Sequence, residues 1–154
     1  MKIILLITTV LLFFGCGNTN NLANNPPLVN LVVQKDKYSM IFKHQFYNNF
    51  RSFDKNLAKF TVQTNLSFNT NSALSNNGNN NLSIVKGTVD FKIFNKINSK
   101  IIKTGSISSS INTGSVSSLY SVDDNNNFAK ERIAKYLASQ LYRKILLNTY
   151  NSES

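Results

Sequence analysis

The sequence is short of the side chains on which most enzymes depend. Its 154 residues include one cysteine, one histidine and seven acidic residues, which are spread along the chain. A catalytic triad, a metal site or a carboxylate pair needs several such groups in one cleft. The nucleotide-binding patterns Gly-x-x-x-x-Gly-Lys-Ser/Thr and Gly-x-Gly-x-x-Gly are also absent. We therefore expect no enzyme activity, no metal and no cofactor, and we interpret His44 as an ordinary helix residue.

The single cysteine, Cys16, has no second cysteine with which to form a disulfide inside the chain. It follows Lys2 and an apolar run from Ile3 to Phe14, which only Thr8 and Thr9 interrupt. A positive start, an apolar stretch and a small residue before the cut are the parts of a secretory signal peptide. The run is shorter than the roughly 20 apolar residues that span a bilayer, and no second run of that length follows. We expect the chain to be exported and its leader to be removed.

The end of this leader, Leu12-Phe13-Phe14-Gly15-Cys16, resembles the lipobox of bacterial lipoproteins. In that family the signal peptidase cuts after the small residue, and the cysteine becomes the acylated first residue of the mature protein. The resemblance makes residues 1–15 the signal peptide and Cys16 the lipidation site. Phe13 and Phe14 stand where the family prefers Leu and a small residue. An ordinary signal peptide with an incidental cysteine, and a retained membrane anchor, are the alternatives.

Lipidation at Cys16 implies a location. A buried methylene contributes about 0.8 kcal/mol, so two or more acyl chains anchor a protein stably, and the cysteine of a lipoprotein carries three. Gly17 differs from the acidic residue that resembles an inner-membrane retention signal, which favours the periplasmic side of the outer membrane. Residues 16–27 are polar and end in two prolines, as is typical of a flexible tether.

Positive charge dominates the sequence, with 17 Lys and Arg residues and a formal net charge of +10. A surplus of this size usually indicates nucleic acid as the partner, but export excludes it. The anions available outside the cytoplasm are lipid headgroups and the phosphates of lipopolysaccharide. Lysines that only keep the protein soluble are the alternative.

A short β-branched run predicts a strand at 28–34, and alternation of apolar and polar residues predicts strands at 60–68, 82–94 and 100–111. On the strand at 82–94 the apolar side, which we expect to face the core, is formed by Val85, Val89, Phe91 and Ile93. The polar side of each strand indicates a sheet with only one covered face. The Asn-rich stretch 69–81 and the Gly/Ser-rich stretch 113–124 are expected to be loops. Gly87 is expected to mark a β-bulge, because the parity of the apolar residues changes near it.

Apolar residues at spacings of three and four predict helices at 38–53 and 128–150. We expect Asp36 to cap the first helix. The candidate caps of the second helix are Asp123, Asp124 and Asn127. These patterns predict a single α+β domain over residues 28–150, of order β-α-β-β-β-α, followed by a C-terminal tail at 151–154. Its four-stranded, mostly antiparallel sheet is covered on one face by the two helices.

This order, together with several segments, resembles the lipopolysaccharide-assembly lipoprotein family, especially its alphaproteobacterial members. The segments that carry the resemblance are Cys16-Gly17, the strand pair VDFKIFNKINSKIIKTGSIS, the stretch Ser118-Leu119-Tyr120-Ser121 and the ending DDNNNFAKERIAKYLASQLYRKILL. They cover most of the mature chain and are patterns of residue class. Asn18 differs from the aromatic residue that members commonly have there.

The resemblance implies that the protein plugs and helps to assemble the outer-membrane β-barrel that exports lipopolysaccharide, and that it binds lipopolysaccharide on its way to the outer leaflet. The candidate binding residues follow from charge alone, because they gather on one predicted hairpin: Lys92, Lys96, Lys100 and Lys103. Lysines that only protect the sheet edge from aggregation are the alternative. Two other functions stay open, an accessory lipoprotein of an ABC-type lipid transporter and a structural lipoprotein that tethers the envelope.

Overall fold

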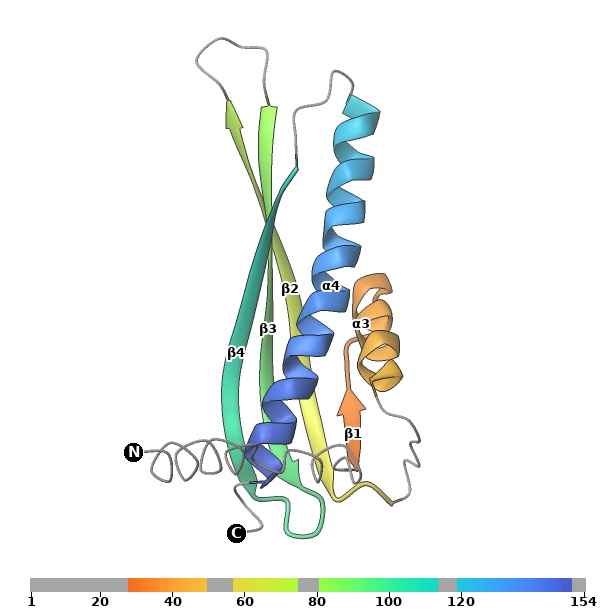
Figure 1. Cartoon of the computed structure of the whole chain (residues 1–154), viewed down its shortest axis with the longest axis vertical. Helices are drawn as coiled ribbons and strands as arrows, with labels where there is room; N and C mark the ends of the chain where they lie inside the picture. The colour runs from red at the N-terminus through yellow and green to blue at the C-terminus, as the bar shows by residue number, and fades with distance from the viewer. Residues whose placement is uncertain (1–27, 50–56, 75–80, 114–118, 151–154) are drawn as a thin grey trace, which may run out of the picture.

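The computed structural model describes residues 28–49, 57–74, 81–113 and 119–150. These residues form six elements (Figure 1): β1 (Val29–Val32), α3 (Lys37–Asn48), β2 (Phe60–Leu74), β3 (Asn81–Asn95), β4 (Ile101–Thr113) and α4 (Leu119–Tyr150). The order β-α-β-β-β-α and the α+β class confirm the sequence prediction. The leader, Cys16 with the tether, and the tail at 151–154 lie outside the described residues.

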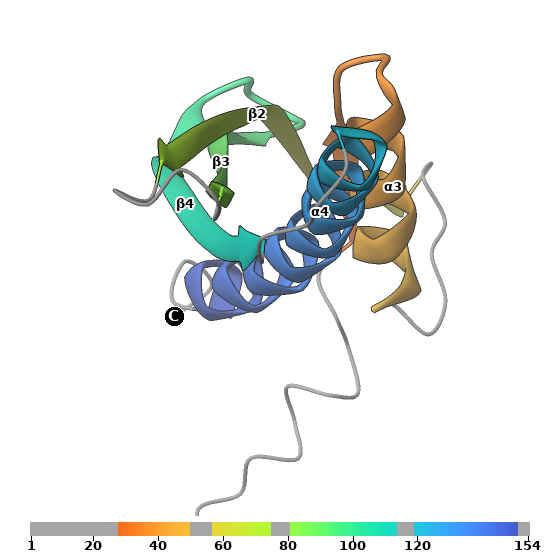
Figure 2. The same ribbon diagram turned by 90° about the horizontal axis from the view of Figure 1, so that it is seen from above.

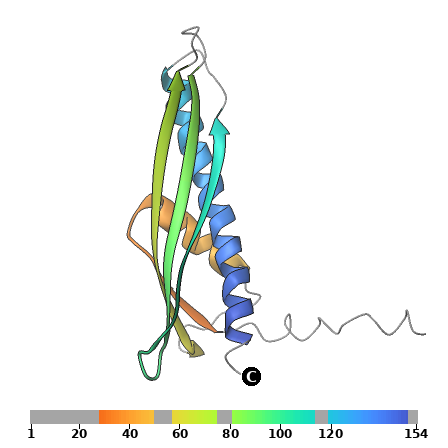
Figure 3. The same cartoon turned by 90° about the vertical axis from the view of Figure 1, so that its left-hand side faces the viewer.

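The sheet has the strand order β1-β2-β3-β4. Its last three strands form an antiparallel meander, while β1 pairs in parallel with the start of β2. The parallel pair is possible because α3 supplies the crossover between the two strands. Both helices lie on the same side of the sheet, as the view along the long axis shows (Figure 2). From the side, the strands lie in front of α4 and run along most of its length (Figure 3).

A single core fills the space between the sheet and the helices. On β3 the predicted inward residues are all buried, namely Val85, Val89, Phe91 and Ile93. They pack with an apolar stripe of α4 that repeats every four residues, formed by Ala129, Ile133, Leu137, Leu141 and Ile145. Burying a large aliphatic or aromatic side chain contributes about 1.5–3 kcal/mol, so this layer is the main source of stability.

Asp36 caps α3 as predicted. Its Oδ1 accepts hydrogen bonds from the backbone N–H groups of Tyr38 (3.0 Å) and Ser39 (2.9 Å). Partial burial raises the pKa of Asp36, but the hydrogen bonds from Ser39 and Tyr38 outweigh it and lower the pKa overall. The helix ends at Asn48, earlier than predicted, and Asn49 is its C-cap. The side-chain amide of Asn49 donates to the carbonyl of Gln45 (2.9 Å), one of the carbonyls that a helix end leaves without a partner.

The loop predicted at 69–81 is wrong at both ends, because residues 69–74 and Asn81 belong to strands, while residues 75–80 lie outside the described residues. β2 continues to Leu74 and β3 begins at Asn81. The register runs on without a break, from Asn69 opposite Lys86 to Leu74 opposite Asn81. Strand pairing uses backbone groups that every residue but proline carries, and this hairpin therefore extends through residues of low strand propensity.

The loop predicted at 113–124 is also wrong at both ends, because β4 includes Thr113 and α4 begins at Leu119, while residues 114–118 lie outside the described residues. Asp123, Asp124 and Asn127 therefore lie inside the helix and are not its caps. Asparagine side chains here bond to other elements. The hydroxyl of Tyr38 donates to Oδ1 of Asn127 (2.8 Å), and that of Thr113 donates to Oδ1 of Asn126 (3.3 Å).

Gly87 does not form the expected bulge, because it pairs in continuous register with Phe68 and Ser109. Gly87 instead allows side chains of α4 and β2 to come close to the backbone of β3. A Cβ at this position would overlap Cγ2 of Ile133 and would lie 3.0 Å from Cε1 of Phe68. Glycine at this position therefore lets α4 lie close against the central strand.

The irregularity of the sheet lies at the start of β4. Ile93 pairs with Lys103 and Phe94 pairs with Ile101, so Ile102 is an extra residue without an opposite partner. An extra residue of this kind bends the strand and redirects its side chains. Both Ile101 and Ile102 are exposed at this end of the sheet.

Candidate functional site

The structure divides the four candidate lysines between two surfaces. Lys92 alternates with buried neighbours on β3 and therefore lies on the face of the sheet that no helix covers. Lys96 and Lys100 flank the turn between β3 and β4, and Lys103 follows on β4. All four side chains are exposed.

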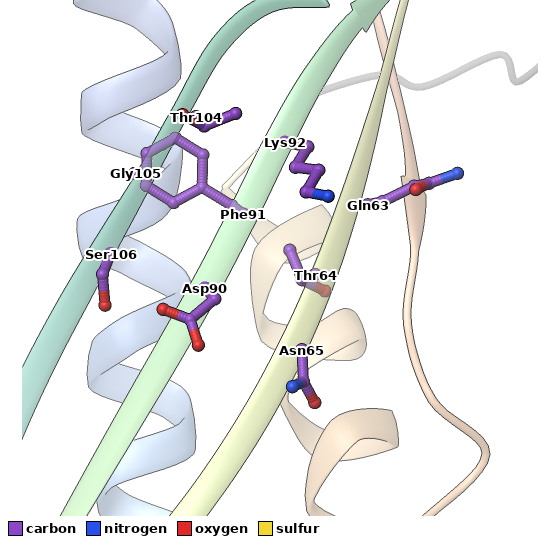
Figure 4. Close-up of a pocket in the computed structure, with 9 residues that line it drawn as sticks. All are labelled: Gln63, Thr64, Asn65, Asp90, Phe91, Lys92, Thr104, Gly105 and Ser106. Atoms are coloured by element: carbon purple, nitrogen blue, oxygen red, sulfur yellow. The ribbon is translucent and has the colours of Figure 1, made fainter.

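The uncovered face has a shallow depression of about 670 Å³ beside Lys92 (Figure 4). Polar side chains from three adjacent strands line it, namely Gln63, Thr64, Asn65, Asp90, Lys92, Thr104 and Ser106. Phe91 also borders the depression, but its side chain is directed to the core and only 2% exposed, so it offers no ring on which a sugar could stack. The Asp90 carboxylate disfavours a phosphate group at this place, because like charges repel. The depression therefore suits polar neutral groups better than anions.

The other three lysines lie where β1, β2 and β4 begin and α4 ends, at the bottom of Figure 1. We call this the basal end and define it as Leu28 with residues 57–60, 93–103 and 143–148. Backbone hydrogen bonds connect its segments. The N–H of Lys59 donates to the carbonyl of Leu28 (2.9 Å), and the N–H of Lys96 donates to the carbonyl of Lys59 (3.0 Å). The first described residue of the chain, Leu28, is thus part of the same end.

Every charged side chain of the basal end is basic, and these are Lys59, Lys96, Lys100, Lys103, Arg143 and Lys144. The acidic residues of the described part of the chain lie elsewhere, at Asp36, Asp90, Asp123, Asp124 and Glu131. The last turn of α4 has no basic residue, so Arg143 and Lys144 lie before the helix end and the helix dipole adds nothing to this set. The basal end is therefore a surface of positive potential.

Two of these cations attach the hairpin to α4. Nζ of Lys103 donates to Oδ1 of Asn148 at 2.7 Å, and the amide of Asn148 donates in turn to the carbonyl of Lys144 at 2.6 Å. Nζ of Lys144 lies 5.5 Å from the centroid of the Phe91 ring, within the range of a cation–π contact. These contacts fix the position of the cationic turn relative to the helix.

Large aliphatic side chains are exposed among the cations of the basal end. The exposed fractions are 91% for Ile97, 66% for Leu147, 63% for Leu57, 51% for Ile101 and 38% for Ile102. Reasoning from the sequence missed this group. Its only signal there is an isoleucine inside a polar turn, Asn95 to Ser99, and the other members are far apart in the chain.

The other sequence-derived candidates bring no further chemistry. His44 is exposed on α3, and its ring nitrogen Nδ1 lies 3.3 Å from the amide nitrogen of Asn48. Within the described ranges, no three His, Cys, Asp or Glu side chains come together as a metal site. None of the helices in these ranges is long and apolar enough to cross a membrane. Cys16 lies outside the described residues.

Comparison with known proteins relates the fold to solved structures. No protein-family model and no curated protein sequence matches the chain. A lipoprotein from Caulobacter crescentus aligns with a TM-score of 0.62 at 14% identity, over 86% of this chain and 96% of that chain. A minor lipoprotein from Acinetobacter baumannii aligns with a TM-score of 0.60 at 15% identity, over 81% of this chain and 94% of that chain. Rare lipoprotein B from Shewanella oneidensis aligns with a TM-score of 0.64 at 10% identity, over 82% of this chain and 99% of that chain. This chain therefore shares the fold of these three bacterial lipoproteins.

Proposed function

We propose that this protein is a lipid-anchored lipoprotein of the bacterial outer membrane. In this proposal it plugs and helps to assemble the barrel that exports lipopolysaccharide, and it binds lipopolysaccharide during export. The observation that carries the proposal is the fold, which matches three lipoproteins over 94% to 99% of their chains. The lipobox-like sequence before Cys16 supplies the anchor that such a protein needs.

The shape of the molecule supports a role inside a barrel. α4 has 32 residues, which correspond to a length of about 48 Å, and the strands β2 and β3 extend alongside it (Figure 3). The module is therefore long and only two layers thick. Its uncovered sheet face presents hydroxyl and amide side chains with few charges, among them Asn65, Ser67, Ser106 and Ser108. A surface of this kind is compatible with the polar interior of an outer-membrane barrel.

The basal end supports the binding of lipopolysaccharide phosphates. Lys96 and Lys100 flank one turn, and Lys103 on the adjoining strand is attached to α4 by its hydrogen bond to Asn148. Point charges arranged on a fixed scaffold bind phosphate oxygens through charge-assisted hydrogen bonds. Lys92 is a weaker candidate, because Asp90 lies two residues away on the same face.

Copurification tests the proposed partner. The full-length chain with a C-terminal affinity tag is expressed in its bacterial host and purified in mild detergent. Recovery of a large outer-membrane barrel as the main partner would support the proposal. Recovery of ABC-type lipid transporter components would instead favour the alternative, an accessory lipoprotein of such a transporter. Mass spectrometry of the product gives the mass of the N-terminal peptide. We expect an acylated Cys16 as the first residue, and Cys16→Ser to abolish the acylation.

Charge reversal tests the ligand. We expect full-length K96E/K100E to capture less lipopolysaccharide than the unmodified chain in a pull-down with immobilised lipopolysaccharide. The matched control, K35E/K86E, makes the same change in net charge at exposed lysines outside the basal end. Equal losses in both variants would indicate a nonspecific effect of net charge and would contradict the assignment to the basal end.

A further inference from the structure

The basal end combines exposed aliphatic side chains with an all-basic set of charges, at the end of the domain to which the N-terminal tether leads. We propose that this end docks on the surface of the membrane that holds the lipid anchor. The aliphatic side chains enter the headgroup region, and the lysines contact the phosphates of anionic phospholipids. The proposal rests on the lipid anchor of the proposed function and adds a second, direct contact between the folded domain and the bilayer.

The aliphatic side chains are concentrated where a membrane contact would need them. Ile97 is the most exposed large apolar residue of the described chain, at 91%, and it lies at the tip of the β3–β4 turn. The other exposed aliphatic residues of this end lie in three further places: Leu57 precedes β2, Ile101 and Ile102 are at the bulged start of β4, and Leu147 is near the end of α4. The exposed apolar residues outside the basal end are scattered over the other elements, at Val32, Met40, Ile84, Phe128 and Tyr136. Single exposed apolar residues are normal, whereas a gathered group indicates an interaction surface.

The turn that presents Ile97 is held in one conformation. Oδ1 of Asn95 accepts the N–H of Ile97 at 2.9 Å, and Oδ1 of Asn98 accepts the N–H of Lys100 at 3.0 Å. Ser99 has a φ of 54°, a left-handed conformation that is uncommon for a residue other than glycine. The side-chain hydrogen bonds of Asn95 and Asn98 and the backbone angle of Ser99 therefore define a turn in which Ile97 is exposed to solvent. A bilayer surface would remove that unfavourable exposure.

The charges select a lipid surface over a protein partner. All charged residues of the basal end are basic, so its complement is an extended anionic surface without cations of its own. Anionic phospholipids provide such a surface, and basic residues close to it contribute strongly to binding. Protein interfaces are instead depleted of lysine relative to the rest of the surface, whereas lysine is the commonest charged residue here.

The tether keeps this end within reach of the membrane. Residues 17–27 link Cys16 to Leu28, and a fully extended chain of that length spans at most about 40 Å. Leu28 itself belongs to the basal end through the hydrogen bond from Lys59. The anchor therefore keeps the basal end within about 40 Å of the bilayer surface, which is close enough for direct contact.

The absence of tryptophan from the sequence gives a direct test. Full-length Ile97→Trp has a single tryptophan at the basal end, and Phe128→Trp is its matched control at an exposed position on α4. Each is reconstituted into vesicles of phosphatidylethanolamine and phosphatidylglycerol that contain brominated lipid. We expect the emission of Ile97→Trp to shift to shorter wavelength and to be quenched severalfold more than that of Phe128→Trp. Equal quenching at the two positions, or none at either, would overturn the proposal.

A second arm tests the role of the lysines. Adding K96E/K100E to Ile97→Trp should reduce quenching on anionic vesicles, because each basic residue near such a surface contributes about a fivefold factor in binding. Adding K35E/K86E should leave it unchanged. The contribution of the lysines should also fall at high salt, since screening shortens the range of surface charges. Unchanged quenching in K96E/K100E would refute the contact between lysines and headgroups.

The results separate this proposal from the proposed function. Quenching at position 97 without copurification of a barrel would support membrane docking and contradict the function in lipopolysaccharide export. Copurification of the barrel without quenching at position 97 would support the function and contradict the docking.

Discussion

Two neighbouring residues of β3 show how differently the two faces of the sheet are built. Phe91 is 2% exposed, packs against Gly105 and lies near Lys144. Lys92, the next residue, is exposed beside the depression of the uncovered face. The covered face is constrained by shape, because close-packed interiors respond to changes of a single methylene. The uncovered face has no such constraint from packing, so its residues are available for a function.

The largest expected effect is the contrast between these two neighbours. We expect Phe91→Ala to lower the free energy of unfolding by about 3–5 kcal/mol, since it removes a buried ring and leaves a cavity. Lys92→Ala should change it by less than about 0.5 kcal/mol. Urea denaturation followed by circular dichroism measures both. A similar loss in the two variants would mean that the uncovered face is buried against something in the folded protein.

Overpacking at Gly87 should have the next largest effect. A methyl group there would overlap Ile133 on α4 and press on the ring of Phe68, so we expect Gly87→Ala to cost about 1–3 kcal/mol. Thr88→Ala, one residue along on the other face, is the matched control and should cost less. If Gly87→Ala proved as stable as the unmodified chain, α4 would be able to move away from β3 without loss.

The hydroxyl of Tyr47 gives a smaller effect that depends on pH. It accepts the backbone N–H of Leu31 at 2.8 Å, on the edge strand β1, and Tyr47→Phe should cost about 1 kcal/mol. Burial raises the pKa of Tyr47, although the hydrogen bond from Leu31 lowers it in part.

The sign of the pH effect follows from that raised pKa. The folded state holds the phenolic proton more tightly than the unfolded state does, so the contribution of Tyr47 is complete below the ordinary tyrosine pKa of about 10. It is lost as the pH rises through the raised value. The free energy of unfolding, measured by denaturation at several values from pH 8 to pH 11, should therefore fall less steeply with pH for Tyr47→Phe than for the unmodified chain. Parallel curves would contradict this account.

The covered face was also the more predictable one. Alternation identified Val85, Val89 and Phe91 as inward residues, and an acidic residue before an apolar stretch identified Asp36 as a cap. Both signals are local, because they depend on neighbours within one element. The start of α4 was not predictable in this way, since the asparagines at 126 and 127 make bonds to Thr113 and Tyr38, which the sequence pattern does not place beside them.

The basal end was predictable only in part, for the same reason. Lys96, Lys100 and Lys103 follow one another along a hairpin, and their charge is visible in the sequence. Lys59 and Leu147 join them only because β2 begins, and α4 ends, beside that hairpin. A surface assembled from separate elements needs the topology as well as the pattern, and no spacing in the sequence indicates it.

The smallest expected effect tests the uncovered face itself. Asn65 is exposed on β2 opposite Asp90, and threonine has a higher strand propensity than asparagine, so Asn65→Thr should stabilise the fold by a few tenths of a kcal/mol. Thermal unfolding would show a small rise in the midpoint. If the variant gains stability but no longer copurifies with a barrel that the unmodified chain binds, asparagine at this position serves binding and not folding. If stability falls instead, the Asn65 side chain makes a structural contact on that face, and the contrast between the two faces would be weaker than Phe91 and Lys92 suggest.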